Sequence, residues 1–188
     1  MPLPVPPRRP FAAIAVAPRA AIAALRFAAP SHAASPPCAA TTVAAGQAPA
    51  ATVGRAVRCL VNAQRAAYHL LPLRPSRELR VAAEAHGADM VAHRFFAHVS
   101  PLSGAITERA RRAGYVRNDD YALGEDIAWG EAELSTPDAI VTAWMNSPGH
   151  RAVILDCDYR DVGVGITTGV PIDSQLPGTT FVLDVGAR

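Results

Sequence analysis

Two stretches near the C-terminus constrain the fold most, because each alternates apolar side chains with small or polar ones. Residues 162–167 alternate valine and isoleucine with glycine and threonine, and residues 181–185 continue the alternation after a turn region at 171–178. A period of two predicts β-strands, and two such runs joined by one loop predict an antiparallel pair. Gly163 and Gly165 fall on one face of the first strand, so another element must pack very close to its backbone.

Helical periodicity precedes these strands. Thr52 is a suitable N-cap for a first helix, which we expect to end before Pro72. Ser76 starts a second helix, and its apolar stripe consists of Leu79, Ala82, Ala83, His86 and Met90. We interpret His86 as a core histidine with a satisfied hydrogen bond, because its place on the stripe predicts burial rather than ligand binding.

A third helix is expected over residues 106–113, with Gly114 as its C-terminal cap. This helix carries three arginines near its end, Arg109, Arg111 and Arg112. We predict that they form a solvated basic end of the helix rather than a binding patch. Residues 123–130 are short, apolar and bracketed by glycines, which predicts a strand that carries one acidic pair.

A fourth helix is expected to begin at residues 135–138, where a hydroxyl cap, a proline and a carboxylate follow one another. We expect it to end at residues 146–149, with His150 directly after it. Helices first, a mixed middle and a strand pair last favour an α+β fold over alternating βαβ units.

The N-terminal part has a different composition. Residues 1–50 are rich in alanine and proline and contain no acidic residue. Arginines followed by apolar runs and then by small residues are typical of an export signal, which we predict at residues 1–34, a low-complexity tail being the alternative. Residues 35–52 are then an Ala/Pro-rich linker and residues 53–188 a single domain. No run approaches the ~20 apolar residues of a membrane span, so we expect a secreted, extracellular or cell-envelope-associated protein.

The net charge limits the classes of binding partner, and the cysteines indicate one disulfide. The formal net charge of the 188 residues is +2, too small to predict binding to nucleic acid or to an anionic membrane. In an oxidising compartment three cysteines predict one disulfide and one remaining thiol. The pairing Cys38–Cys59 is favoured because it holds the tail to the first helix, and Cys59–Cys157 is the alternative. The sequence contains no Cys-x-x-Cys pair, and this spacing excludes a cysteine-based zinc site.

Three separated polar residues form the candidate site: His98, Glu125 and His150. Two imidazoles and one carboxylate suit Zn²⁺ or another divalent cation with a position left open for water, and they equally suit a proton-transfer network without metal. No nucleophile is identified. Ser147 lacks the glycine setting of a nucleophile elbow, and Cys157 is an inactive thiol unless it is ionised.

The chain resembles the CAP superfamily (cysteine-rich secretory proteins, antigen 5 and pathogenesis-related proteins), in its bacterial SCP-like branch. The resemblance runs from about residue 57 to residue 186. Its blocks are Cys59 to Arg65, Phe96 to Pro101, Gly124 to Gly130, Trp144 to Arg151 and Val162 to Gly165.

This resemblance implies an α-β-α sandwich with a central antiparallel sheet and a cleft, in which two histidines and two acidic residues hold a divalent cation. His98, Glu125 and His150 match three members of that set. The fourth, a glutamate on the helix before the second histidine, has no match, since that helix offers only Asp138 at its far end. Asp126 also replaces the asparagine usual after the glutamate.

The first functional hypothesis is a secreted, monomeric CAP-domain protein whose polar cleft binds a lipid, a peptide or a cell-envelope ligand, with a weak divalent metal site at His98, Glu125 and His150. A metal-dependent hydrolase with Glu125 as base is the second hypothesis, and a structural or interaction module with a vestigial site is the third. The missing fourth ligand favours a protein without enzymatic activity.

Overall fold

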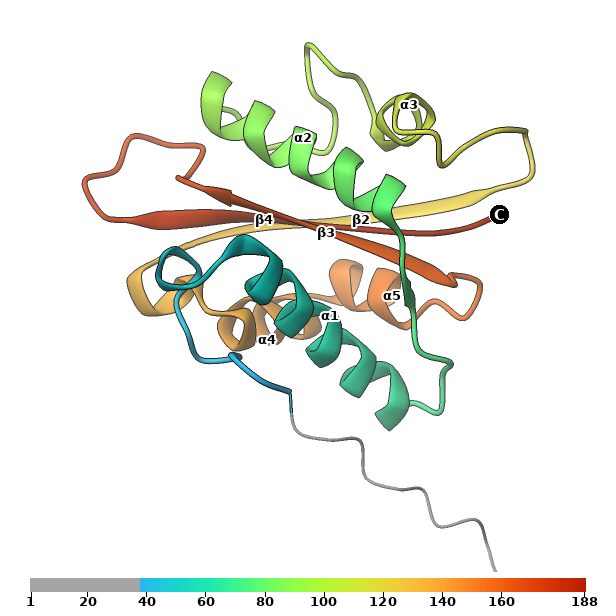
Figure 1. Cartoon of the computed structure of the whole chain (residues 1–188), viewed down its shortest axis with the longest axis horizontal. Coiled ribbons are helices and arrows are strands. Elements are labelled where there is room, and N and C mark those ends of the chain that lie inside the picture. The colour runs from blue at the N-terminus through green and yellow to red at the C-terminus, as the bar shows by residue number, and fades with distance from the viewer. Residues whose placement is uncertain (1–37) are drawn as a thin grey trace, which may run out of the picture. The chain divides into compact units, whose positions relative to one another are not determined.

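The structure, a computed structural model, describes residues 38–188 (Figure 1). The predicted export signal and the first residues of the predicted linker lie outside this range. The helices are η1 (Ala45–Gln47), α1 (Ala50–Ala67), α2 (Arg77–His93), α3 (Ile106–Arg112), η2 (Ala132–Ser135), α4 (Pro137–Asn146) and α5 (Pro148–Leu155). The strands are β1 (Arg74–Pro75), β2 (Ala122–Glu131), β3 (Asp161–Thr168) and β4 (Gly178–Ala187).

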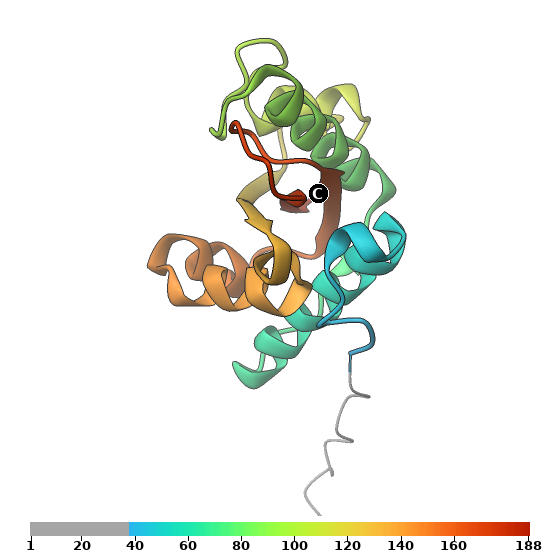
Figure 2. The ribbon, with the colours of Figure 1, turned by 90° about the vertical axis from the view of Figure 1, so that its left-hand side faces the viewer.

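The elements form three layers. The strands make one sheet in the order β1-β3-β4-β2, in which β4 runs antiparallel to both β2 and β3. Helices α2 and α3 cover one face, and α1, α4 and α5 cover the other, as the two ribbon views show (Figure 1, Figure 2). The expected α+β sandwich is therefore confirmed. The sheet is mixed rather than wholly antiparallel, because the two-residue β1 pairs parallel to β3.

The main core lies between the sheet and α1, α4 and α5. It buries Trp144 and Phe181 among aliphatic side chains of α1, β3 and β4. The Trp144 indole also donates a hydrogen bond to the Ile127 carbonyl, 3.3 Å away. On the other face, Met90 of α2 packs with Ile127 and Val182. Burial of these apolar surfaces on both faces is the main stabilising contribution to the fold.

The predicted close approach to the first strand is confirmed, and the element that makes it is α2. A Cβ added at Gly163 would collide with the backbone of Leu79 and Arg80, and one at Gly165 with the backbone of Ala83. The glycines therefore let the helix lie directly on β3. The predicted start of α2 is also confirmed, since Ser76 is its N-cap and accepts a hydrogen bond from the Leu79 amide.

Adding a methyl group at Gly163 is expected to lower the free energy of unfolding by about 2 kcal/mol, because the α2 backbone must move away from β3. Urea denaturation of Gly163→Ala measures this loss. Gly46→Ala is the matched control, since no atom of the described residues lies within 4 Å of a Cβ there, and a change below about 0.5 kcal/mol is expected. Equal losses in the two variants would contradict this reason for the glycine.

Local predictions were wrong at the starts of two helices, α1 and α5. Helix α1 begins at Ala50 after Pro49, so Thr52 is not its N-cap, and the helix starts before the predicted domain start at residue 53. Helix α2 ends at His93, where Arg94 adopts a left-handed conformation (φ 53°). Pro148 begins α5, which the sequence did not predict, because a proline that ends one helix also suits the first position of the next.

The remaining local features agree with expectation. Thr136 caps α4 by accepting a hydrogen bond from the Ala139 amide. The favoured disulfide, Cys38–Cys59, is formed, and Cys157 is free and exposed. None of the helices within residues 38–188 combines the length and the apolar composition that a bilayer crossing requires.

Candidate functional site

His98 lies in the loop between α2 and α3, and polar contacts hold this loop in place. The His86 Nε2 atom lies 3.0 Å from the Ala97 carbonyl, directly before His98. Asp89 on α2 accepts hydrogen bonds from the hydroxyls of Ser100 and Ser103. The loop is thus anchored to α2 on both sides of His98, whose side chain stays 55% exposed.

Glu125 lies on β2, the edge strand, and its carboxylate is buried beneath the loop. Oε1 accepts a hydrogen bond from His98 Nδ1 at 2.9 Å, while Oε2 accepts one from the Arg109 guanidinium. His86 Nε2 lies 3.8 Å from Oε1. The Glu125 side chain is 3% exposed, so these contacts replace its hydration. The structure therefore brings two of the three predicted site residues, His98 and Glu125, into contact.

Arg109 corrects the prediction of a solvated basic end on α3. Its side chain is 1% exposed, and besides Glu125 it donates to the carbonyls of His98 at 3.1 Å and Gly104 at 2.6 Å. Arg111 and Arg112 are exposed as predicted. The difference arises because Arg109 and Ala110 face β2 in this short helix, and the buried carboxylate of Glu125 provides a partner that the local sequence does not reveal.

The charges of His98 and Glu125 support each other. The hydrogen bond to Glu125 raises the pKa of His98 above its usual value, against the opposing effect of burial. Burial alone would raise the pKa of Glu125, but the hydrogen bond from His98 and the charge of Arg109 outweigh it and hold that pKa below its usual value. Near pH 7 the site therefore favours an ionised carboxylate beside an imidazole that readily takes up a proton.

His150 lies in the first turn of α5, on the other side of the sheet from α2. Burial, and then the charge of His98, lower its pKa, so the two imidazoles are close enough to interact electrostatically. No hydrogen bond or ion pair within residues 38–188 joins His150 to His98 or Glu125, and its Nδ1 atom is buried without a partner. His150 thus interacts electrostatically with His98 but is not hydrogen-bonded to the His98–Glu125 pair among the described residues.

Two buried carboxyl groups accompany Glu125, and sequence reasoning gave neither a role. Asp184 on β4 stands directly opposite Glu125 in the antiparallel ladder. Burial, and then the charge of Glu125, raise the pKa of Asp184 well above its usual value. For the same two reasons the pKa of Asp126 rises to about 8, and both its oxygens are buried without hydrogen-bond partners in the described structure. Glu125 is therefore the carboxyl that ionises first among these three.

The donor set does not fit a divalent cation in this arrangement. Both oxygens of Glu125 already accept hydrogen bonds, and one of the donors is the cationic Arg109, which repels a metal ion. Within residues 38–188, one group of three potential ligands has all its donor atoms within 4.8 Å, and it consists of Asp156, Cys157 and Asp158. The three predicted site residues do not form such a group.

The comparisons agree with this fold. The chain belongs to the Cysteine-rich secretory protein family (CAP), which matches residues 59–183, so the resemblance seen in the sequence is confirmed. Among similar proteins of Bacillus subtilis (strain 168), YkwD is 35% identical over 116 residues, covering 62% of this chain and 43% of YkwD. The membrane protein YlbC is 34% identical over 107 residues, covering 57% of this chain and 29% of YlbC. This chain therefore spans less than half the length of these relatives.

Two solved structures are similar. An extracellular SCP-domain protein of Bacillus anthracis str. Ames superposes with a TM-score of 0.54 at 26% identity, covering 69% of this chain and 39% of that one. An outer surface protein of Borrelia burgdorferi has a TM-score of 0.56 at 18% identity, covering 70% of this chain and 90% of that one. The second likeness shows the fold alone.

Proposed function

We propose that this protein is a secreted CAP-domain binding protein whose cleft at His98, Glu125 and His150 takes up an acidic group of a lipid, peptide or cell-envelope ligand. One observation carries the proposal: buried Glu125 holds Nδ1 of a half-exposed imidazole. The other ring nitrogen of His98, Nε2, is then the atom presented to a ligand. Protonated His98 can donate a charge-assisted hydrogen bond to a carboxylate or phosphate.

The surroundings of His98 suit recognition more than metal chemistry. Glu125 and Arg109 lock the ring orientation, since both partners are almost fully buried. His150, with its lowered pKa, stays neutral beside the charged ring and supplies a second, uncharged hydrogen-bonding group. A ligand that combines an acidic group with a neighbouring hydroxyl or amide would match this pair.

Secretion is part of the proposal. The Cys38–Cys59 disulfide is typical of oxidising compartments, and one similar structure is that of an extracellular protein. Detection of the processed protein in the culture medium, with the N-terminus determined by mass spectrometry, tests both export and the predicted cleavage near residue 34.

Hydrolysis is a second candidate, because a carboxylate that orients an imidazole is also the arrangement of a general base. The structure favours His98 rather than Glu125 as that base, since Glu125 is paired with Arg109. Turnover of ester and peptide substrates that disappears in His98→Asn, but not in the exposed control His69→Asn, would favour hydrolysis over binding.

The His98–Glu125 pair predicts a measurable titration. NMR titration should give a pKa for His98 above the usual value of about 6.5, and Glu125→Gln should bring it below that value, since burial remains while the carboxylate charge is lost. Because the folded-state pKa is raised, the stabilisation by His98 is complete below the unfolded-state pKa and is lost as pH rises through the folded-state pKa. Urea midpoints of wild type and His98→Asn, compared at acid and alkaline pH, should converge at alkaline pH.

Ligand uptake is tested with two probes, phosphatidylglycerol vesicles and a tripeptide with a free C-terminal carboxylate. At least one is expected to shift the His98 and His150 resonances of wild type, and His98→Asn should abolish binding while His69→Asn retains it.

Zinc, titrated by calorimetry, should give equal heats with wild type and His98→Asn. A normal His98 pKa in wild type would contradict the proposed role of Glu125, and saturable zinc binding lost in His98→Asn would contradict the metal-free site.

A further inference from the structure

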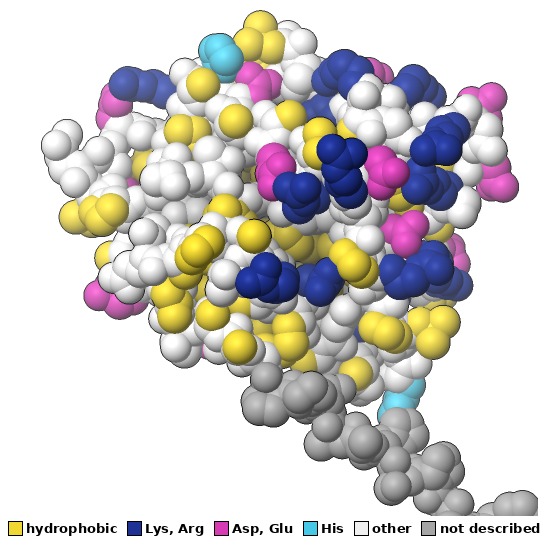
Figure 3. Space-filling model, in the orientation of Figure 1, with side chains coloured by type: hydrophobic (Ala, Val, Ile, Leu, Met, Phe, Trp, Pro, Cys, Tyr) yellow, Lys and Arg dark blue, Asp and Glu magenta, His cyan; other side chains and the backbone are white. Residues whose placement is uncertain are grey.

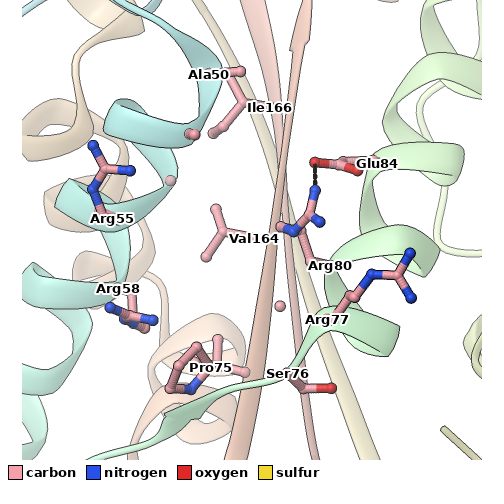
Figure 4. A pocket seen from close by; sticks show the side chains of 14 residues that line it. Ala50, Arg55, Arg58, Pro75, Ser76, Arg77, Arg80, Glu84, Val164 and Ile166 are labelled. Atoms are coloured by element: carbon pink, nitrogen blue, oxygen red, sulfur yellow. Dashed lines mark hydrogen bonds and ion pairs between the residues drawn. The ribbon is translucent and has the colours of Figure 1, made fainter.

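A groove of about 540 Å³ lies between α1 and α2, at the edge of the sheet opposite to β2 (Figure 4). Its floor is β3, from Val162 to Ile166. Three of the α1 residues that line it are small, and they are Ala50, Ala51 and Gly54. We call this site the arginine groove, because arginines stand along both of its sides.

The sheet edge in the arginine groove is covered along only part of its length. Strand β1 has two residues, and its pairing with β3 ends at Pro75 and Val162. The Ser76 amide makes the last hydrogen bond of this pairing, to the Val162 carbonyl at 2.8 Å. Beyond this point the chain turns into α2, so within residues 38–188 the rest of the β3 edge has no neighbouring strand.

The backbone groups of Val164 and Ile166 point toward this open edge. Along β3, alternate residues direct their amide and carbonyl groups to opposite sides. Val162 bonds outward to β1, and Gly169, an odd-numbered residue, bonds inward to Gly178 at 2.8 Å, so even-numbered residues face outward. No hydrogen bond between elements in residues 38–188 uses the Val164 or Ile166 backbone on this side. Such unpaired groups are the usual template for an added strand.

The charges on the two sides are strongly positive. Arg55 and Arg58 project from α1, and Arg77 and Arg80 from α2. Of these four arginines, only Arg80 has an ion-pair partner among the described residues, and this partner is Glu84 at 2.6 Å. The space-filling view shows basic side chains gathered over α1 and α2, with apolar and acidic side chains between them (Figure 3). Three guanidinium groups are therefore available to an acidic partner.

We propose that the arginine groove binds an extended acidic peptide segment of another protein, which pairs with β3 as an additional strand. Successive side chains of a strand point to opposite faces of the sheet. Acidic side chains of the added strand would therefore reach α1 and α2 in turn, which accounts for arginines on both sides. A single anionic headgroup would need only one cluster. The N-terminal part of this chain is unsuitable, because residues 1–50 contain no acidic residue.

The probe is a fluorescein-labelled peptide with two Glu-Glu-Val-Val repeats, followed by fluorescence anisotropy. Wild type is expected to bind this peptide. The affinity of the triple variant Arg55→Gln, Arg58→Gln, Arg77→Gln should be lower by about tenfold or more. The control triple variant Arg111→Gln, Arg112→Gln, Arg117→Gln has the same charge change on exposed arginines outside the groove, and should bind within about twofold of wild type. Thermal unfolding confirms that both variants fold.

Strand addition has its own readouts. The same peptide, N-methylated at every residue, should lose binding by about tenfold or more, since it has no backbone donors. Hydrogen exchange of the Val164 and Ile166 amides should slow when the unmethylated peptide is bound. Equal weakening by the two triple variants, unaltered binding of the methylated peptide, or failure of the unmethylated peptide to bind while phosphatidylglycerol vesicles bind and lose binding in the Arg55, Arg58 and Arg77 variant would each overturn the proposal.

Discussion

Arg109→Met is expected to lower the free energy of unfolding at neutral pH by about 4 kcal/mol, the range found when one partner of a buried ion pair is removed. Methionine fills much of the same volume but leaves Glu125 buried without its strongest counter-charge. It also removes the donor to the carbonyls of His98 and Gly104. Urea denaturation at about pH 7 measures the loss.

The pH dependence separates this charge effect from a loss of packing. In wild type the lowered pKa of Glu125 contributes stability that is present above its unfolded-state pKa and lost as pH falls. In Arg109→Met burial should raise that pKa, so the deficit of the variant should shrink as pH falls from about 7 to about 4. Arg111→Met and Arg112→Met, on exposed positions of the same helix, should each change stability by less than about 0.5 kcal/mol. A deficit independent of pH would contradict the role of Glu125.

Arg65→Met is expected to cost a similar amount, about 4 kcal/mol, since a fully buried guanidinium would be lost. Arg65 lies near the end of α1 and donates to four backbone carbonyls, those of Leu71, Ile154, Asp156 and Tyr159. These bonds tie α1 to the end of α5 and to the segment before β3. Removing them leaves buried acceptors without partners, and thermal or urea unfolding measures the cost.

Arg65→Lys is the informative companion. Lysine keeps the positive charge but cannot present the planar fork of donors, so about half of the loss is expected. Arg74→Met is the control, because that side chain is 73% exposed and its ion pair with Asp161 is at the surface. Losses as large in Arg74→Met as in Arg65→Met would contradict the importance of the buried carbonyl bonds.

Local sequence signals predicted what depends on near neighbours in the chain. Ser76 and Thr136 begin helices as expected, because an N-cap hydroxyl needs only the amide three residues later. The end of α4 was also predicted, but the same Ser-Pro pair begins α5, and both readings fit the local pattern. A helix end and a helix start share their signals there, so the sequence alone did not resolve them.

The candidate site shows the limit of this reasoning. His98 and Glu125 were predicted from their match to a family pattern, and the structure brings them into contact. Arg109 and Asp184 were missed, since nothing in their local sequence distinguishes them from surface residues. Their environment is created by packing of α3 against β2 and by pairing of β2 with β4.

Local patterns in the sequence predicted the main helices and strands other than α5 and β1, the apolar stripe of α2 and the need for glycine at 163 and 165, because periodicity and backbone space are local properties. Which charged side chains are buried depends on how the layers pack. Arg109 lies on the same short helix as two exposed arginines, yet it alone reaches Glu125. The open edge of β3 likewise follows from where β1 ends and α2 begins. Burial of a charge and pairing of a strand edge both depend on neighbours distant in sequence, and these are set only when the layers pack.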